Sequence, residues 1–171
     1  WKRAYHKFSE LMAAVVYEDP WLAGGHNGLS NAEDPTKPED PYPRVKALRT
    51  ELGVRPEERV MLLMLDGPEM VFAFFGAIKI GAVPIPTNTL WTAADYEFVL
   101  RDSRASVVIV GAALHSRIAT VVPRCPWVRH VVIAGEAGDR TATHFDALIG
   151  RGSPTLDAEP THRDAPAFWL Y

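Results

Sequence analysis

The chain has 171 residues, of which 47% are hydrophobic, and its 18 Lys and Arg against 21 Asp and Glu give a net charge of −3. This composition is typical of one soluble globular domain and excludes a disordered or collagen-like chain. The basic residues are scattered, so we expect no nucleic-acid partner. The longest apolar stretch, residues 71–86, contains Lys79 and is shorter than the ~20 residues of a membrane span, so no membrane partner is expected either.

The single cysteine, Cys125, cannot form a disulfide within the chain. One lone thiol favours a reducing compartment, and we expect a cytoplasmic protein. Cys125 lies between Arg124 and Pro126 with no adjacent histidine to act as a base, so it is expected to be an inert thiol. The chain begins at Trp1 without a leader pattern, and we expect this end to be a fragment edge or a processed end.

The first quarter of the chain differs from the rest. Residues 1–43 carry four basic and seven acidic groups, which is the whole net charge of −3. Apolar residues at helical spacing predict an amphipathic helix over residues 2–17. Residues 19–43 are dense in Pro, Gly, Asn and Asp, which is typical of a loop. We therefore expect a divergent amino-terminal region, 1–43, before an α/β region, 44–171.

The α/β region begins with a predicted helix over residues 44–52, ended by Gly53, and a strand over 59–65. Pro68 and Glu69 suit the first turn of a second helix, for which we predict a buried stripe of four apolar residues. These are Val71, Phe74, Phe75 and Ile78. A strand is predicted over 82–85, after Gly81.

Thr92 and Asp95 have the spacing of a capping box, so a further helix should start there, with Tyr96, Val99 and Leu100 facing the core. The remaining predicted elements are strands at 106–110, 128–133 and 165–171 and helices at 113–122 and 144–149. Continuous apolar runs such as residues 107–110 are typical of strands covered on both faces. The predicted fold is α/β, a layered parallel sheet of the Rossmann or flavodoxin-like type flanked by helices.

No loop has the glycines and lysine of a phosphate-binding cradle. The glycine-rich stretches at 24–28 and 135–139 are interpreted as turns. His130, inside an apolar strand, is interpreted as a structural histidine, and His144 as a surface residue. The histidines lack metal-binding spacing, so no metal ligand is predicted.

None of the serines lies in the glycine-flanked elbow of a hydrolase nucleophile. They are Ser9, Ser30, Ser103, Ser106, Ser116 and Ser153. The aromatic pairs Phe74–Phe75 and Phe168–Trp169 could line an apolar pocket, but their spacing favours core packing. The residues by themselves predict a fold without an active site: no catalytic residue is assigned, and cofactor-binding residues stay unknown.

Residues 60–103, VMLLMLDGPEMVFAFFGAIKIGAVPIPTNTLWTAADYEFVLRDS, resemble the amino-terminal region of adenylate-forming (AMP-binding) enzymes, within them the benzoate-CoA ligase group. The closing THRDAPAFWLY, residues 161–171, resembles that group's segment immediately before its phosphate loop. The resemblance covers about residues 44–171. It implies the amino-terminal subdomain of a larger acyl- or aryl-CoA ligase.

Such an enzyme activates an aromatic or other small carboxylic acid with ATP and Mg²⁺, forms an acyl-adenylate, and transfers the acyl group to coenzyme A. The resemblance implies that the phosphate loop and the catalytic lysine lie after Tyr171. No catalytic residue is therefore carried over to this sequence, and the 171 residues alone are expected to be inactive and to bind no cofactor tightly. The enzyme assignment applies only to a full-length acid-thiol ligase.

The sequence departs from the family at Gly67, where the family usually has Ser or Thr. Compared with those residues, glycine weakens a helix cap by about a few tenths of a kcal/mol. Residues 1–43 also lack the expected strand pair and longer helix. Two other readings stay open, a stand-alone flavodoxin-like binding or regulatory module and a non-functional truncated gene product. In the ligase reading, ligands of open parallel sheets bind beyond the carboxyl ends of the strands, which places Asp66, Asn88 and Gly111 nearest a pocket. Each lies at a turn, and turn chemistry alone accounts for it, so none is assigned as a site residue.

Overall fold

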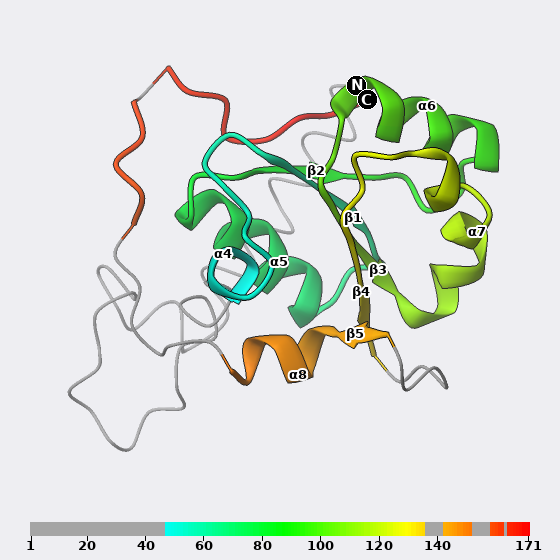
Figure 1. Cartoon of the computed structure of the whole chain (residues 1–171), viewed down its shortest axis with the longest axis horizontal. Helices are drawn as coiled ribbons and strands as arrows, with labels where there is room; N and C mark the ends of the chain where they lie inside the picture. Colours follow the sequence, from blue (N-terminus) through cyan, green and yellow to red (C-terminus); the bar gives the residue numbers. More distant parts are fainter. Residues whose placement is uncertain (1–46, 136–141, 152–157, 163) are drawn as a thin grey trace. The chain divides into compact units, whose positions relative to one another are not determined.

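The fold is centred on a parallel sheet with strand order β2-β1-β3-β4-β5 (Figure 1). The computed structural model describes residues 47–135, 142–151, 158–162 and 164–171, all within the unit Asp40–Tyr171. The predicted helix at 2–17, the loop at 19–43 and the glycines at 24–28 lie outside the described residues, as do residues 136–139 of the second glycine-rich stretch. The predicted α/β fold with a parallel sheet is confirmed.

The strands are β1 (Arg59–Leu63), β2 (Val83–Pro86), β3 (Val107–Gly111), β4 (His130–Ala134) and the short β5 (Thr143–His144). The first four lie where the apolar runs predicted them, with ends shifted by one or two residues. β5 was not predicted: Thr143 had no assignment, and His144 was predicted as the first residue of a helix. The register places Leu63 beside Val110 and Gly111 beside Ala134, so the carboxyl ends of β1, β3 and β4 form one edge of the sheet.

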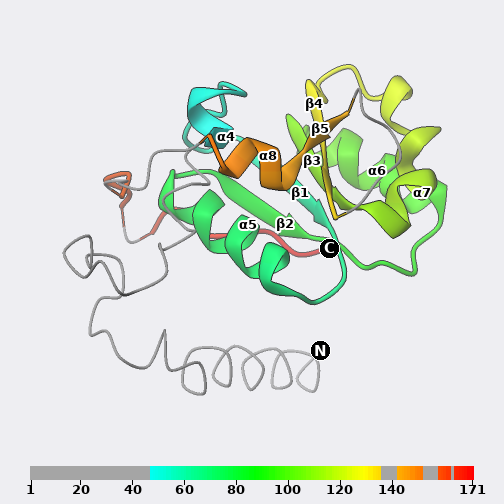
Figure 2. The same ribbon diagram turned by 90° about the horizontal axis from the view of Figure 1, so that it is seen from below.

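Helices cover both faces of this sheet (Figure 2). Successive side chains of a strand point to opposite faces. In β1, Val60 and Leu62 pack with α4 (Ala47–Thr50), α5 (Pro68–Lys79) and α8 (Phe145–Ile149). Met61 and Leu63 pack on the other face, with α6 (Ala93–Ser103) and α7 (His115–Ala119). The strands are thus buried from both sides, as their continuous apolar runs predicted.

Helix α5 begins at Pro68, as predicted, with Gly67 at its N-cap position. The predicted buried stripe was wrong in three of its four positions: Phe74 is buried, but the other three side chains are half-buried. The buried face is made by small residues instead. They are Ala73, Gly76 and Ala77, next to Phe74. Small side chains let the helix backbone approach the sheet closely, and a search for large apolar residues at helical spacing does not detect such a face.

Helix α6 has the predicted capping box. The Asp95 N–H donates to Thr92 Oγ1 at 3.4 Å, and the Thr92 N–H donates to Asp95 Oδ2 at 2.9 Å. Tyr96, Val99 and Leu100 are buried, as predicted. The helix ends at Arg104, whose φ of 52° is left-handed.

The other predicted helices agree only in part. Of the helix predicted at 44–52, the described residues 47–52 contain α4, and residues 44–46 lie outside the described residues. The helix predicted at 113–122 is shorter, because α7 lies between two 3-10 turns, η1 (Ala112–Leu114) and η2 (Val122–Arg124). Helix α8 begins at Phe145, one residue later than predicted. Across the described residues, none of the helices combines the length and the apolar character that crossing a membrane requires.

The predicted strand at 165–171 is wrong, because residues 164–171 lie beside β2 without forming a ladder (Figure 2). The Val83 N–H donates to Glu58 O, immediately before β1, and the Thr87 N–H donates to Leu62 O of β1. Because peptide groups alternate along a strand, residues 84 and 86 face the outer edge, and both are prolines without an N–H. Among the described residues one backbone bond joins the segment to β2, from Trp169 N to Pro84 O at 3.1 Å.

The aromatic pairs are only partly in the core. Phe74 and Phe75 contact each other edge to face at 5.2 Å between ring centroids, and Phe74 is buried. Phe168 and Trp169 are each 37% exposed, which corrects the prediction that they are core residues. Leu170 is 49% exposed. The segment covers the edge of β2 and leaves apolar surface of its own open.

Candidate functional site

The carboxyl edge of the sheet is the candidate site. In the order β2-β1-β3-β4-β5, the chain leaves β1 toward β2 and returns past β1 to β3. The switch point therefore lies between the carboxyl ends of β1 and β3, where open α/β sheets of this order bind ligands. The β1–α5 loop and the 3-10 turn η1 border this point.

The three residues predicted nearest a pocket all lie at this edge. Asp66 is exposed in the β1–α5 loop, and Gly111 is the last residue of β3. A Cβ added at Gly111 would lie 3.9 Å from Leu63 O and Met64 Cα, so this position is in van der Waals range of the end of β1. Asn88 lies one strand away, after β2. Their role in binding stays a prediction.

The loop between β2 and α6 is held by hydrogen bonds from both helices on that face. Asn88 Oδ1 accepts from the Leu90 N–H at 2.8 Å, and the Asn88 carbonyl accepts from Tyr96 Oη at 3.1 Å. The Thr89 carbonyl accepts from Arg117 of α7 at 3.1 Å. Leu90, at the tip of this loop, is 81% exposed. The loop therefore has a defined path at the carboxyl edge.

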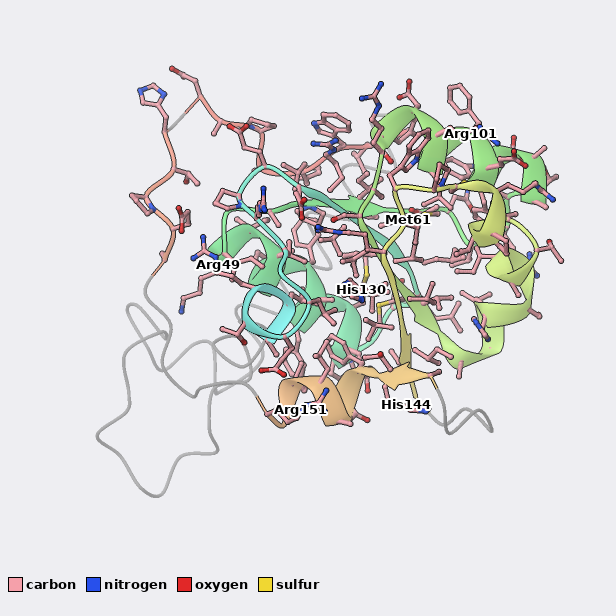
Figure 3. All side chains as sticks on the ribbon, viewed as in Figure 1. Arg49, Met61, Arg101, His130, His144 and Arg151 are labelled. Atoms are coloured by element: carbon pink, nitrogen blue, oxygen red, sulfur yellow. The ribbon has the colours of Figure 1, made fainter. Side chains whose placement is uncertain are left out.

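The titratable candidates are dispersed. Figure 3 labels His130 and His144 at separate places, at the start of β4 and at the end of β5. Cys125 is a buried free thiol, and burial raises its pKa, which opposes the thiolate form that nucleophilic chemistry needs. Across residues 47–135, 142–151, 158–162 and 164–171, no three His, Cys, Asp or Glu side chains are grouped to hold a metal ion.

A polar cluster that the sequence reasoning missed lies at the opposite, amino edge of the sheet. Glu58 Oε2 accepts from Arg129 at 2.6 Å, from Ser106 Oγ at 3.2 Å and from the Arg55 N–H at 3.1 Å. Glu58, Ser106 and Arg129 each immediately precede a strand, and parallel strands all start at one edge, so their shared position could have predicted the contact. This cluster ties together the starts of β1, β3 and β4.

Comparison with known proteins identifies the family. Residues 46–171 match the family model described as AMP-binding enzyme. A benzoate-CoA ligase of Thauera aromatica is 44% identical over 125 residues, which is 73% of this chain and 23% of that enzyme. A 4-hydroxybenzoate-CoA/benzoate-CoA ligase of Rhodopseudomonas palustris is 30% identical over 93% of this chain and 30% of its own length.

The fold agrees with a solved relative. An anthranilate CoA ligase in complex with anthranoyl-AMP superposes with a TM-score of 0.70 at 36% identity, over 73% of this chain and 24% of that protein. The chain thus spans between 23% and 30% of the length of these relatives. Because the family match includes every described residue of the parallel sheet, this chain belongs to the family of AMP-binding enzymes.

Proposed function

We propose that this chain is the amino-terminal part of an ATP-dependent aryl-CoA ligase. The observation that carries the proposal is the 44% identity to a benzoate-CoA ligase over 125 residues, 73% of this chain. A second relative acts by name on benzoate and 4-hydroxybenzoate, and the solved one holds anthranoyl-AMP, an acyl-adenylate. The proposed substrates are accordingly a small aromatic carboxylic acid, ATP and coenzyme A, with Mg²⁺ as the metal.

We expect the described residues not to bind ATP or Mg²⁺ tightly by themselves. The strand-to-helix joint after β1, Asp66-Gly67-Pro68-Glu69, has no lysine, and the described residues contain no metal-ligating cluster. Phosphoryl chemistry needs positive charge and N–H donors around the developing negative charge. The role proposed for this chain is therefore to shape one wall of the site at the carboxyl edge, through the β1–α5 and β2–α6 loops.

The proposal also assigns the two regions of the chain. Residues 44–171 form the α/β subdomain, and residues 1–43 form a divergent amino-terminal extension. The alignment with the Rhodopseudomonas palustris enzyme covers 93% of the chain, more than residues 44–171 alone provide, which supports treating residues 1–43 as part of the enzyme. Cys125 as a buried free thiol fits the reducing environment of a cytoplasmic enzyme.

The test is an assay of the purified polypeptide that contains this chain. ATP, Mg²⁺ and coenzyme A are supplied with benzoate, 4-hydroxybenzoate or anthranilate, and with butyrate and a long-chain fatty acid as non-aromatic controls. We expect acid-dependent release of pyrophosphate and consumption of coenzyme A, with kcat/KM at least about tenfold higher for an aromatic acid, the scale on which pocket fit discriminates substrates. Equal turnover of all five acids, or of none, would contradict the proposal.

The 171-residue chain assayed alone supplies a second test. We expect neither pyrophosphate release nor tight binding of ATP or benzoate by calorimetry, because most of the relatives' length lies outside the matched part. Turnover by the chain alone would show that its own residues suffice for catalysis. If the longer polypeptide is inactive while the short chain unfolds cooperatively and is monodisperse, the stand-alone module becomes the better description.

A further inference from the structure

The segment of residues 164–171 is held at the edge of β2 mainly by its side chains. Its single described backbone bond to β2 cannot be followed by a ladder, because Pro84 and Pro86 present no N–H to that edge. An earlier part of the same stretch is fixed by Glu159, whose N–H donates to Lys79 O and whose carboxylate pairs with Arg49 at 2.5 Å. Glu159 lies near Lys79, before β2, and Trp169 lies near Pro84, within β2, so these two described positions follow one another in the direction of β2, toward the carboxyl edge.

Side chains of residues 164–171 contact helices on both faces of the sheet. On one face, the Phe168 ring lies 5.5 Å from the ring of Phe74 in α5. On the other face, the Tyr171 ring packs edge to face against Phe98 of α6, with centroids 6.3 Å apart. The segment is therefore attached to both helical layers at the sheet edge.

One polar contact fixes the direction of the end of this segment. Tyr171 Oη donates to Asp102 Oδ2 at 2.6 Å, a short bond of the kind that a charged acceptor makes. Burial and this hydrogen bond raise the pKa of Tyr171 to about 12, so the hydroxyl keeps the proton that it donates. The Arg59 guanidinium lies 5.6 Å from the centre of the Trp169 ring and donates to Ser103 O at 2.6 Å, joining β1 to the same end of α6.

Helix α6 connects this contact to the candidate site. At its amino end the capping box and the hydrogen bond from Tyr96 to Asn88 fix the β2–α6 loop at the carboxyl edge. At its other end Asp102 holds Tyr171. One rigid element thus sets the positions of a loop at the site and of the segment that runs toward the site.

We propose that Asp102 is a positioning residue of the ligase, which acts through Tyr171 to set the path of the edge segment toward the carboxyl edge, where the substrates bind. The proposal rests on the proposed function. It predicts that losing the Asp102–Tyr171 bond weakens substrate binding and leaves the chemical step in place, because displaced positioning groups act through geometry.

The kinetic test uses the longer polypeptide and compares Asp102→Ala, Tyr171→Phe and the double variant with the unmodified enzyme. We expect each single variant to raise the KM of ATP or of the aromatic acid by about three- to tenfold, the effect of one hydrogen bond, while kcat changes by less than about twofold. The double variant should show the same loss as either single variant, because both remove one bond. Unchanged KM values, or additive losses, would overturn the proposal.

Two further variants separate positioning from general damage to α6. Asp102→Asn keeps an oxygen that accepts from Tyr171, so its KM values should return to within about twofold of the unmodified enzyme. Arg101→Gln is the matched control, since Arg101 precedes Asp102 on the helix but bonds to Glu97 and to the Arg124 carbonyl. A rise in KM for Arg101→Gln equal to that for Asp102→Ala would show a general effect and overturn the proposal.

Hydrogen exchange provides a readout that does not depend on catalysis. In Asp102→Ala, amide exchange of residues 165–171 should accelerate by about tenfold, because the segment has little backbone bonding to retain it, while β3 stays protected. Unchanged exchange would disprove the attachment itself. If the unmodified enzyme turns over no acid with ATP but exchange responds as expected, the proposed function fails and the catalytic role of the attachment falls with it, while the attachment stands.

Discussion

Helices α5 and α6 lie on opposite faces of one sheet and are stabilised in different ways. They are 12 and 11 residues long. The first turn of α6 is closed by a reciprocal side-chain cap, whereas Gly67 at the N-cap of α5 offers no side-chain hydrogen bond. Conversely, α5 buries a face of small residues against the sheet. Helix α6 thus depends more on local hydrogen bonding, and α5 on close packing.

The difference between the capped helix α6 and the closely packed helix α5 shows which structural features can be recognised in a short stretch of sequence. A cap is a pattern of two residues at fixed spacing, and Thr92 with Asp95 is recognisable in isolation. A close-packed face depends on what the sheet presents opposite it, and Ala73 or Ala77 carries no sign of its partner. The two helices can be tested as a pair, since each predicts a different kind of sensitive position.

The largest expected effect comes from removing a large core side chain of α6. Leu100 is fully buried among residues of β1, β3 and α7, so Leu100→Ala should lower the free energy of unfolding by about 3 kcal/mol, from lost burial and the cavity left. Urea unfolding measures this. The control is Leu90→Ala, the same change at an 81% exposed side chain, where less than about 0.5 kcal/mol is expected. Similar losses at both sites would contradict the assigned burial.

For α5 the sensitive change is the opposite one, an addition of volume. Ala77 is fully buried between the helix and the sheet, so Ala77→Leu should destabilise the protein by about 2 kcal/mol through overpacking. The neighbouring half-buried Ile78 provides the control, because Ile78→Leu conserves volume and should cost less than about 1.5 kcal/mol. The denaturant midpoints of the two variants are compared, and they report stability directly if the m-values of the two unfolding curves are equal. If Ala77→Leu were neutral, α5 would not be closely packed.

Sequence patterns predicted the fold well where the signal was local. Val- and Ile-rich runs predicted the four longer strands, and the parallel order follows from helices on both faces. Two errors have a common cause, since both depend on contacts distant in sequence. The small-residue face of α5 was missed for this reason, and the strand predicted at 165–171 fails because Pro84 and Pro86 remove its hydrogen-bond donors. The spacing of those two prolines is visible in the sequence, but the sequence does not show that residues 164–171 lie beside them.

For the candidate site, the sequence predicted only its place at the carboxyl edge of the sheet. The position of Asp66, Asn88 and Gly111 follows from where the strands end, which the apolar runs show. The contacts that fix the surrounding chain join residues far apart: Tyr171 and Asp102 are separated by 69 positions, and Glu58 and Arg129 by 71. Side-chain hydrogen bonds leave no periodic pattern, so the sequence has no signal for the Tyr171–Asp102 pair. For Glu58 and Arg129 the signal is indirect, since each residue immediately precedes a strand.

A medium-sized effect is expected at the cap of α6. Thr92→Ala removes the hydroxyl that accepts from Asp95 N and donates to its carboxylate, and should cost about 1 kcal/mol. Thr92→Ser keeps the hydroxyl and is the control, expected within about 0.5 kcal/mol of the unmodified protein. Unfolding free energies at neutral pH decide the result. A loss for Thr92→Ser as large as for Thr92→Ala would indicate that the methyl group, and not the cap, matters.

The same cap predicts a pH dependence. Hydrogen bonds from the Thr92 side chain and backbone lower the pKa of Asp95 below its ordinary value of 3.8. A carboxyl whose pKa is lowered on folding contributes stability above its ordinary pKa and loses it as the pH falls through the lowered value. The difference between Thr92→Ala and the unmodified protein should therefore shrink below about pH 4. A difference that is constant from neutral to strongly acidic pH would contradict the role of the carboxylate.

The smallest expected effect is a gain, at the cap that α5 lacks. Gly67 has φ 179° and ψ 172°, an extended conformation that any residue adopts, so a side chain there adds no backbone strain. A new Cβ would lie 3.2 Å from Glu69 Oε2, the end of a flexible side chain that can move aside. Gly67→Ser should therefore stabilise the protein by about 0.3–0.5 kcal/mol, because its hydroxyl can accept from an unpaired N–H of the first turn.

The control for this gain is Gly67→Ala, which adds the same Cβ without a hydroxyl. Serine should be more stable than alanine at this position by about 1 kcal/mol, the usual difference between a capping and a non-capping residue. Thermal unfolding of the three proteins in one buffer resolves a difference of that size. If serine and alanine were equivalent, the start of α5 would be satisfied by packing alone, and the contrast between the two helices would be complete: one would be insensitive to its cap and the other dependent on it.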